Sequence, residues 1–428
     1  MELKKYKKKR VVPKGWKEIT LADVFRTSSG ATPLSTEASF YEEGTIPWIN
    51  SGELSSPYIY STTNFISQLG FDNSSTEMYP IDTVLVAMYG ATAGKASLLK
   101  MEACTNQAVC AILPNNNYSS TFLKYSIDTL YDHLVGLSSG SARDNLSQAE
   151  LKKLKVIMPS TKNEQDKLIS ILTLLDRKIA LNRAINQNLE KMAKQLYDYW
   201  FVQFDFPNEE GKPYKSSGGK MVWNETLKRE IPNGWEILQL GKICSFRNGI
   251  NYSKDEVGKL YPIVNVRNIS ATTILLDGEE FDMVSIASNK ADNYILTDKD
   301  IIIARSGCPG ATRLLQNPQN TLFCGFIICC TPKDCYMRSY LTYVLKGLEG
   351  SSATTSGGSI LQNISQDTLK SLWVILPKKN ILQRYDEVLN YILKQMYSSL
   401  SNTKELTKQR NELLPLLMNG QISPLNCD

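Results

Sequence analysis

Val12-Pro13-Lys14-Gly15-Trp16 recurs as Ile231-Pro232-Asn233-Gly234-Trp235, about 218 residues further along the chain. Three more segments recur in the same order and with nearly the same displacement: Thr83–Ala87 as Asp300–Ala304, Asn145–Gln148 as Asn363–Gln366, and Val156–Pro159 as Val374–Pro377. Ordered matches with a near-constant displacement indicate an internal repeat. The sequence therefore predicts two copies of one unit, related by pseudo-two-fold symmetry.

Each copy begins with a β-rich part and ends with a long helix. Strand-like segments alternate with turn residues, as in TIPWIN (45–50) and TVLVAMYG (83–90) of the first copy and YPIVNV (261–266) and IIIARSG (301–307) of the second. A proline then leads into a helical stretch of about 40 residues. We predict an α+β fold with two β-rich domains, each followed by a long helix.

The helical stretches carry a heptad seam, because apolar residues recur in alternating steps of four and three. The seam is apolar at both ends and polar in the middle, with Asn182 and Asn186 in one helix and Ser399 and Thr403 in the other. We predict that the two helices pair as an antiparallel coiled coil in which these polar layers meet. The alternative is that each helix packs only on its own domain. The residues predicted to pair the helices are Leu168, Leu172, Leu175, Ile179, Leu189, Leu196, Leu389, Ile392, Met396, Leu406 and Leu413.

The repeat and changes in composition set the predicted boundaries. Residues 201–231 are rich in Gly, Pro, Ser and charged residues and are typical of a connection. The predicted parts are a basic tail (1–15), a first domain (16–158), a first helix (159–200), the connection (201–231), a second domain (232–376), a second helix (377–418) and a C-terminal tail (419–428).

Composition places the chain among ordinary globular proteins. It has 428 residues, 42% of them hydrophobic and 21% charged. No apolar run approaches the roughly 18 residues that span a membrane, so we expect no membrane association and a cytoplasmic location. The net charge of +5 comes from the N-terminal tail. That tail either contacts phosphate groups or is a solvated terminus.

The sequence contains no recognisable catalytic or metal-binding motif. The nine cysteines form no C-x-x-C pair, and His133 is the only histidine, without an evident nucleophile beside it. Gly90–Lys95 is superficially like a phosphate-binding loop, but it has three residues between its glycines where four are required. We therefore expect no catalytic residues, no metal site and no cofactor in this chain.

Charge bears on binding to nucleic acid. Residues 16–158 carry a net charge of −5, and residues 232–376 a net charge of zero. Because contacts to phosphate dominate affinity for DNA, such domains bind DNA weakly alone unless their basic residues gather on one face or a partner supplies phosphate contacts. Arginine and asparagine near strand ends are nevertheless suited to bidentate contacts with guanine and adenine.

The repeated motifs together resemble the specificity subunit of type I restriction–modification systems. They are the [IV]-P-x-G-W opening, the strand ending in A-x-x-G or A-R-x-G, the segment S-G-S-A-R-D-N-L-S-Q (139–148) and the V-I-x-P lead-in to a long helix. The resemblance covers essentially the whole chain. The second copy departs from it at Gly357–Gln362, which lacks a counterpart of Arg143.

The resemblance implies a non-catalytic subunit whose two target-recognition domains each read one half of a bipartite, asymmetric double-stranded DNA site. The paired helices set the spacer between the halves and dock two methyltransferase subunits. S-adenosylmethionine then binds to those partners, and ATP and Mg²⁺ serve restriction subunits where these are present. The resemblance implies that DNA is contacted by Asn50, Tyr89, Lys95, Arg143, Asn265, Arg267, Arg305 and Arg313.

Two other classes of protein fit the sequence less well. A bivalent protein-binding scaffold has the same architecture and suits the acidic first domain. A self-contained nuclease or methyltransferase requires a catalytic motif that the sequence does not contain.

Overall fold

A computed structural model describes residues 12–139, 146–253, 255–270, 273–276, 281–350, 355–356, 359–360 and 363–422. Arg143 and residues 1–11 of the basic tail lie outside these residues. The chain divides into two compact units. The first unit comprises Met1–Ile179 and Glu405–Asp428, and the second comprises Ala180–Lys404. Each unit therefore contains part of both long helices.

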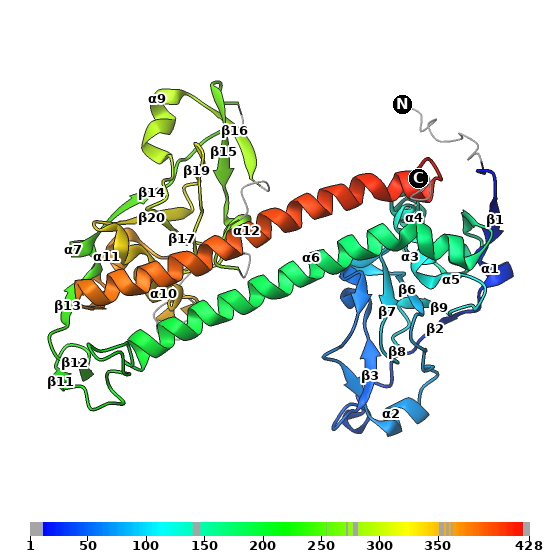
Figure 1. Cartoon of the computed structure of the whole chain (residues 1–428), viewed down its shortest axis with the longest axis horizontal. Coiled ribbons are helices and arrows are strands. Elements are labelled where there is room, and N and C mark those ends of the chain that lie inside the picture. The colour runs from blue at the N-terminus through cyan, green and yellow to red at the C-terminus, as the bar shows by residue number, and fades with distance from the viewer. Residues whose placement is uncertain are drawn as a thin grey trace. The chain divides into compact units, whose positions relative to one another are not determined.

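The first unit contains two β-sheets and a separate strand pair (Figure 1). The five-stranded sheet has the order β2-β9-β6-β7-β4, and the three-stranded sheet has the order β5-β3-β8. Strands β1 and β10 pair antiparallel at the two ends of the domain sequence. The strands are β1 (Trp16–Thr20), β2 (Thr27–Ser29), β3 (Ile46–Ile49), β4 (Tyr58–Ile59), β5 (Phe65–Ile66), β6 (Val84–Ala87), β7 (Ala96–Leu99), β8 (Cys104–Thr105), β9 (Val109–Ile112) and β10 (Lys155–Pro159).

Short helices connect these strands, and the long helix α6 follows them. The helices are α1 (Leu21–Val24), η1 (Ala38–Phe40), η2 (Ser51–Ser55), α2 (Gln68–Asp72), η3 (Gly90–Thr92), α3 (Ser120–Asp128), α4 (Tyr131–Ser139), α5 (Gln148–Lys152) and α6 (Lys162–Tyr197), with a π-helical turn η4 (Asp198–Val202) at its end. Helix α6 begins after Pro159, where the sequence predicts the change from strand to helix.

The second unit repeats this topology. Its sheets have the orders β14-β20-β17-β18 and β16-β15-β19, and β13 pairs with β23 as β1 pairs with β10. The strands are β11 (Met221–Asn224), β12 (Arg229–Pro232), β13 (Glu236–Gln239), β14 (Cys244–Asn248), β15 (Lys259–Val264), β16 (Asp282–Ile286), β17 (Ile301–Ala304), β18 (Thr312–Arg313), β19 (Leu322–Phe323), β20 (Ile327–Pro332), β21 (Thr355–Ser356), β22 (Ser359–Ile360) and β23 (Trp373–Leu376). The predicted α+β repeat is confirmed.

The helices of the second unit end with the second long helix. They are α7 (Leu240–Ile243), α8 (Val266–Ile269), α9 (Ser288–Ala291), η6 (Asp292–Tyr294), η7 (Cys335–Met337), α10 (Arg338–Lys346), α11 (Gln366–Ser371) and α12 (Lys379–Met418). Within the described residues, no helix is long and apolar enough to cross a membrane.

The recurring N-[LI]-S-Q motif has the same structural role in both units. The backbone N–H of Leu146 donates to the carbonyl oxygen of Met88 at 3.0 Å, and that of Ile364 donates to Arg305 at 2.8 Å. The hydroxyl oxygens of Ser147 and Ser365 then cap helices α5 and α11. In each unit the motif thus holds the residue before the capping serine against the residue that directly follows a buried strand, β6 in the first unit and β17 in the second.

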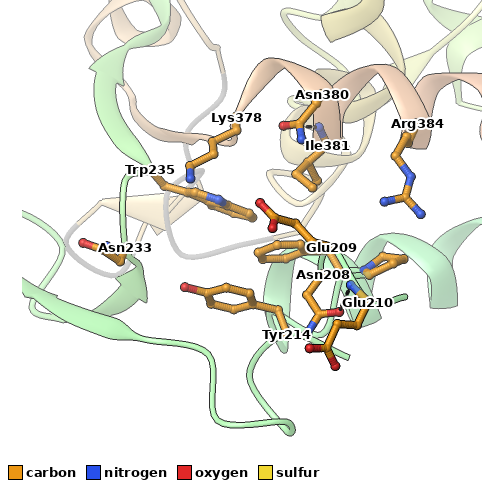
Figure 2. A pocket seen from close by; sticks show the side chains of 12 residues that line it. Asn208, Glu209, Glu210, Tyr214, Asn233, Trp235, Lys378, Asn380, Ile381 and Arg384 are labelled. Atoms are coloured by element: carbon orange, nitrogen blue, oxygen red, sulfur yellow. Dashed lines mark hydrogen bonds between the residues drawn. The ribbon is translucent and has the colours of Figure 1, made fainter. Parts of the chain in front are cut away.

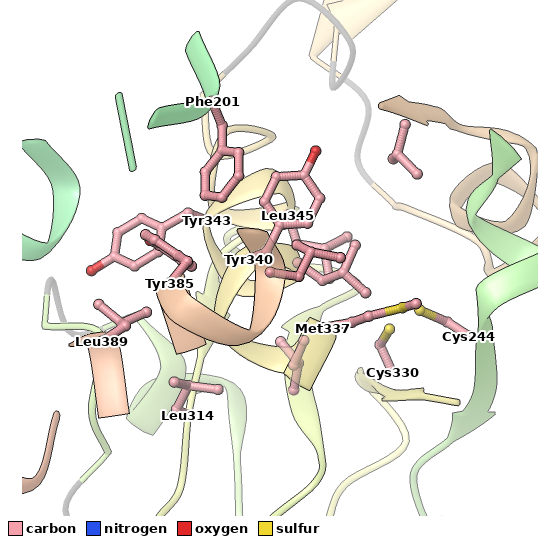
Figure 3. Close-up of a cluster of buried hydrophobic side chains, with 14 of the residues drawn as sticks. Phe201, Cys244, Leu314, Cys330, Met337, Tyr340, Tyr343, Leu345, Tyr385 and Leu389 are labelled. Carbon is pink, nitrogen blue, oxygen red and sulfur yellow. The ribbon is translucent and has the colours of Figure 1, made fainter. Parts of the chain in front are cut away.

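The core of each unit includes residues of both long helices. In the first unit, Leu168 and Leu172 of α6 share a buried cluster with Leu417 and Met418 of α12. In the second unit, Ala193 of α6 shares a cluster with residues of α12 and with Phe201, whose ring lies 4.7 Å from that of Tyr340 and 4.8 Å from that of Tyr385 (Figure 3). Low-numbered residues of α6 therefore meet high-numbered residues of α12.

The predicted pairing residues are mostly on the inner faces of these helices. Ser399 Oγ donates to the carbonyl oxygen of Asn182 at 3.1 Å, so the polar layers meet, but through a backbone group. Pairing along the full helices stays a prediction. The residues that are buried are Leu168, Leu172, Leu175, Ile179, Leu389, Ile392 and Met396. Those that are half-buried are Leu189, Leu196, Leu406 and Leu413.

One glycine in each unit, at equivalent positions, allows two backbone segments to approach closely. A Cβ atom on Gly30 would lie 1.8 Å from the carbonyl oxygen of Thr105, and one on Gly249 would lie 2.1 Å from that of Cys324. We predict that Gly30→Ala lowers the free energy of unfolding by about 3 kcal/mol, because the backbone must move. Chemical denaturation measures this change.

Gly52→Ala is the matched control, since a Cβ atom on Gly52 meets nothing within 4 Å and its φ is not positive. A Gly30→Ala protein that is as stable as Gly52→Ala would contradict this description of the sheet.

Candidate nucleic-acid interface

Two asparagines occupy equivalent positions, each directly after the central strand of a three-stranded sheet. Asn50 follows β3 and begins η2, and Asn265 follows β15 and begins α8. The Asn50 N–H donates to Glu53 Oε1 at 2.9 Å, and the Asn265 N–H donates to Asn268 Oδ1 at 2.8 Å. Both asparagines therefore start a tight helical turn.

A second turn follows the buried strand β6 or β17 in each unit. Gly90 and Gly307 have φ near +76° and +78°, which favours glycine. The turns close in the same way, because Gly94 N–H donates to Ala87 at 2.9 Å and Gly310 N–H donates to the equivalent Ala304 at 3.0 Å. These are tight glycine turns, and neither forms a phosphate-binding loop that opens a long helix.

The two turns lie against each other in both units. In the first unit, Thr92 Oγ1 donates to the carbonyl oxygen of Ser51 at 2.8 Å. In the second, a Cβ atom on Gly307 would lie 2.9 Å from Val266 Cγ1. In each unit the two turns therefore form one surface, which we call the double turn. It consists of the turn that begins at Asn50 and the glycine turn after β6 in the first unit, and of the turn that begins at Asn265 and the glycine turn after β17 in the second. The side chains on the two double turns differ.

In the first unit the double turn presents Asn50, Tyr89 and Lys95. Tyr89 is exposed, and Asn50 and Lys95 are half-buried. Asn50 Oδ1 accepts a hydrogen bond from Asn106 Nδ2 at 3.1 Å, which fixes the orientation of the Asn50 amide. The structure therefore brings together three of the predicted residues from two segments about 40 residues apart.

In the second unit the double turn presents Asn265, Arg267 and Arg305. Arg267 is 65% exposed and forms an ion pair with Asp282 of β16. The same carboxylate accepts from Asn265 Nδ2 at 2.8 Å. Asp282 thus orients two predicted contact residues at once, a role that the sequence did not reveal because Asp282 lies in a separate strand.

Phe326 is a further candidate that the sequence analysis missed. Its side chain is 61% exposed, and its carbonyl oxygen accepts from the Arg305 N–H at 2.8 Å. The surrounding run FCGFIICCTP is so apolar that it indicates only a buried strand. Phe326 in fact precedes β20 and lies beside Arg305, where a flat apolar ring is available for stacking.

Arg313, which the resemblance implied as a DNA contact, has a buried side chain in this structure. It lies in β18 opposite Ile302, the position that Ser97 occupies opposite Leu85 in the first unit. Its side chain is 3% exposed, and Nη1 lies 2.5 Å from Glu349 Oε1. Both residues of β18 are buried, so the charge of Arg313 is used inside the unit. Arg143 lies outside the described residues.

The cysteines of the described residues are mostly buried thiols. Burial raises the pKa of Cys110 and of Cys329 to about 12, so both are protonated at neutral pH. Within the described part of the chain, no three His, Cys, Asp or Glu side chains are grouped to hold a metal ion.

A pocket of about 340 Å³ in the second unit lies between the connection and the start of α12 (Figure 2). Its aromatic wall is formed by Phe206, whose ring stacks on Tyr214 at 4.6 Å and on Trp235 at 4.9 Å. Lys378 and Arg384 line it from the other side (Figure 2). None of the double-turn residues lines this pocket, and we assign no ligand to it.

Comparisons with known proteins agree on one family. The sequence pattern of the type I restriction modification DNA specificity domain matches residues 13–191 and again residues 232–415. The specificity subunit of the type I restriction enzyme MjaIX of Methanocaldococcus jannaschii is 26% identical over 422 residues, which are 96% of this chain and 94% of that protein. The HindI specificity subunit of Haemophilus influenzae is 24% identical over 350 residues, 69% of this chain and 74% of that protein.

The fold is also found among solved structures. The crystal structure of a type I restriction–modification S subunit from M. genitalium superimposes with a TM-score of 0.59. It is 16% identical, and the match covers 96% of this chain and 98% of that one. At this identity the likeness shows a shared fold.

Proposed function

The chain belongs to the family of type I restriction–modification DNA specificity domains, and on that basis we propose that each of its two units reads one half of a bipartite, asymmetric DNA site. The observation that carries this proposal is the double-turn surface, which has the same backbone in both units and different side chains on it. Two domains that read two different half-sites need the same backbone frame and different side chains at the contact surface.

The side chains on each double turn favour contacts with base edges. Arginine pairs bidentately with guanine, and asparagine pairs with adenine. The second unit offers Asn265, Arg267 and Arg305, with Asp282 holding the first two in place. The first unit offers Asn50, Tyr89 and Lys95, so the two units read different bases.

Partner subunits supply what this chain lacks. The net charge of −5 over residues 16–158 is unsuited to strong binding of phosphate, so other subunits clamp the DNA backbone while the double turns specify the bases. Catalysis and its cofactors also belong to these subunits: S-adenosylmethionine to two methyltransferase subunits, and ATP and Mg²⁺ to restriction subunits where present. The complex acts in the cytoplasm, where its DNA is.

An exposed apolar stripe on α6 is the surface proposed to dock a methyltransferase subunit. In the second unit, Leu181, Ile185 and Met192 recur at helical spacing and are 59%, 41% and 54% exposed. They lie along the edge of the stripe that contains Leu189 and Leu196, which pack on the core of the unit. Exposed apolar stripes of this kind are typical of protein interfaces.

The first prediction concerns the second half-site. Arg267→Ala with Arg305→Ala is expected to relax base choice in one half by about 10-fold or more, because each bidentate contact contributes about 1–3 kcal/mol of discrimination. The other half and the gap stay as in the wild type. Mapping of the adenines or cytosines methylated by the assembled complex measures both halves in one experiment.

Lys299→Ala with Lys370→Ala is the matched control, since it likewise removes two positive charges from the second unit, here from exposed side chains. An equal loss in both halves, or the same loss in the control, would show that Arg267 and Arg305 contribute only charge.

The second prediction concerns the gap between the half-sites, which the helices are proposed to set. Removal of residues 177–183 together with 401–407 takes one heptad from each helix and preserves the phase of the seam. The helices become shorter by about 10 Å, so the gap is expected to shrink by about three base pairs. An unchanged gap in a folded, active complex would refute this role of the helices.

The third prediction concerns docking. Leu181→Glu with Ile185→Glu is expected to lower the affinity for the methyltransferase subunit by at least about 100-fold, because two carboxylates replace apolar contacts. Ala180→Glu with Gln187→Glu adds the same charges to a neighbouring exposed face of α6 and is expected to bind normally. If both variants bind the methyltransferase subunit equally well in a titration, the stripe is not part of the interface.

A further inference from the structure

A buried ionic group joins the two long helices in the first unit. Asp176 of α6 has a side chain that is only 2% exposed. Its carboxylate accepts a hydrogen bond from Tyr125 Oη at 2.6 Å and faces Arg410 Nη1 of α12 at 3.1 Å. Tyr125 Oη also lies 3.1 Å from Tyr58 Oη. A carboxylate this deeply buried is tolerated only while these partners are present.

A second ion pair lies beside the first on helix α3. Lys124 Nζ lies 2.7 Å from Asp128 Oδ2, and the Lys124 side chain is almost fully buried. Its ammonium group also lies 4.8 Å from the centre of the Tyr125 ring. The first unit therefore places four charged side chains where one domain meets both long helices.

The second unit has an apolar junction at the equivalent positions. The displacement of the repeat maps Asp176 to Leu393, Arg410 to Ala193 and Tyr125 to Tyr343. These three residues are buried in one hydrophobic cluster, part of which Figure 3 shows. Tyr343 Oη is buried without a hydrogen-bond partner within the described residues. Lys124 and Asp128 correspond to Thr342 and Lys346, so the second ion pair is not repeated, and Lys346 instead pairs with Glu349 at 3.4 Å.

The difference between the units shows that the positions of Asp176 and Arg410 do not need charge in order to pack. Leucine and alanine fill the same place in the second unit, and buried ion pairs are often no more stabilising than apolar residues of similar volume. Polar groups in such seams are known to select which helices pair, because a wrong partner leaves a buried charge unsatisfied.

We propose that Asp176 and Arg410 select the pairing of helix α6 with α12 and disfavour the pairing of α6 with a second α6 or of α12 with a second α12. If two α6 helices from two molecules paired, each Asp176 would face Ala193. If two α12 helices paired, each Arg410 would face Leu393. Only the pairing of α6 with α12 places the acid opposite the base and the leucine opposite the alanine.

The internal repeat makes wrong helix pairings possible, and the Asp176–Arg410 pair disfavours them. Because both helices carry the same seam, two homotypic pairings between molecules, α6 with α6 and α12 with α12, compete with the pairing of α6 with α12. Each homotypic pairing leaves two charged side chains in the seam without the opposite charge, whereas the pairing of α6 with α12 brings the two charges together. The inference concerns assembly of the chain, and it stands whether or not the double turns read DNA.

The test measures exchange between full-length chains. Two versions of the chain with different affinity tags are mixed in denaturant, refolded together and captured through the first tag. The wild type is expected to carry little of the second tag. Asp176→Leu with Arg410→Ala, which gives the first unit the residues of the second, is expected to raise cross-capture at least about tenfold.

Two further variants keep the test decisive. Asp176→Arg with Arg410→Asp reverses the pair and is expected to stay near the wild-type level, because the opposite charges still meet only between α6 and α12. Glu18→Ala with Lys155→Ala removes an exposed ion pair of the first unit and is also expected to stay there. Circular dichroism and thermal unfolding establish that each variant is folded.

The proposal is overturned if the apolar variant, shown to be folded, exchanges no more than the wild type. It is also overturned if the reversed variant exchanges as much as the apolar one, or if the control does. A lower unfolding temperature without exchange would mean that Asp176 and Arg410 contribute stability alone.

Discussion

The packing of α6 against α12 is the constraint on which the rest of the structure depends. Each β-rich domain is completed by a helix from the other copy: Leu417 and Met418 of α12 are buried in the core of the first unit, and Ala193 of α6 is buried in that of the second. Neither copy of the repeat therefore contains a whole core. The repeat folds because each half supplies the apolar surface that the other half must cover.

This constraint separates the parts of the chain that must stay alike from those that can differ. The paired strands at the ends of each domain, the capped helices after the N-[LI]-S-Q motif and the inner faces of the long helices are nearly the same in both units. The double turns project from this common frame. Their backbone is fixed by the glycines and by the asparagine caps, while the side chains differ: Tyr89 and Lys95 lie on the double turn of the first unit, and Arg267 and Arg305 lie on that of the second. A frame of this kind lets recognition change without changing the fold.

Features that local sequence patterns determine were predictable, and features that depend on tertiary contacts were not. The repeat, the α+β class and the long helices were predictable, because spacing and periodicity express them directly. The position of Asn50 and Asn265 at strand ends was predictable because each follows a recognisable strand. The burial of Arg313 was not predictable, because both residues of β18 are buried and the carboxylate that pairs with Arg313 comes from Glu349, 36 residues further along the chain. Asp282 and Phe326 were missed because their place beside Arg267 and Arg305 comes from tertiary contacts.

The central claim is that two unlike surfaces on one frame specify two half-sites at a fixed distance. The measurement that tests it most directly is selection of bound duplexes from a randomised pool by this chain assembled with its methyltransferase subunit. The account predicts two different short motifs separated by one constant gap. Selection of a single motif, of two motifs at variable distance, or of no motif by an intact complex would contradict it, and the last result would favour a protein scaffold instead.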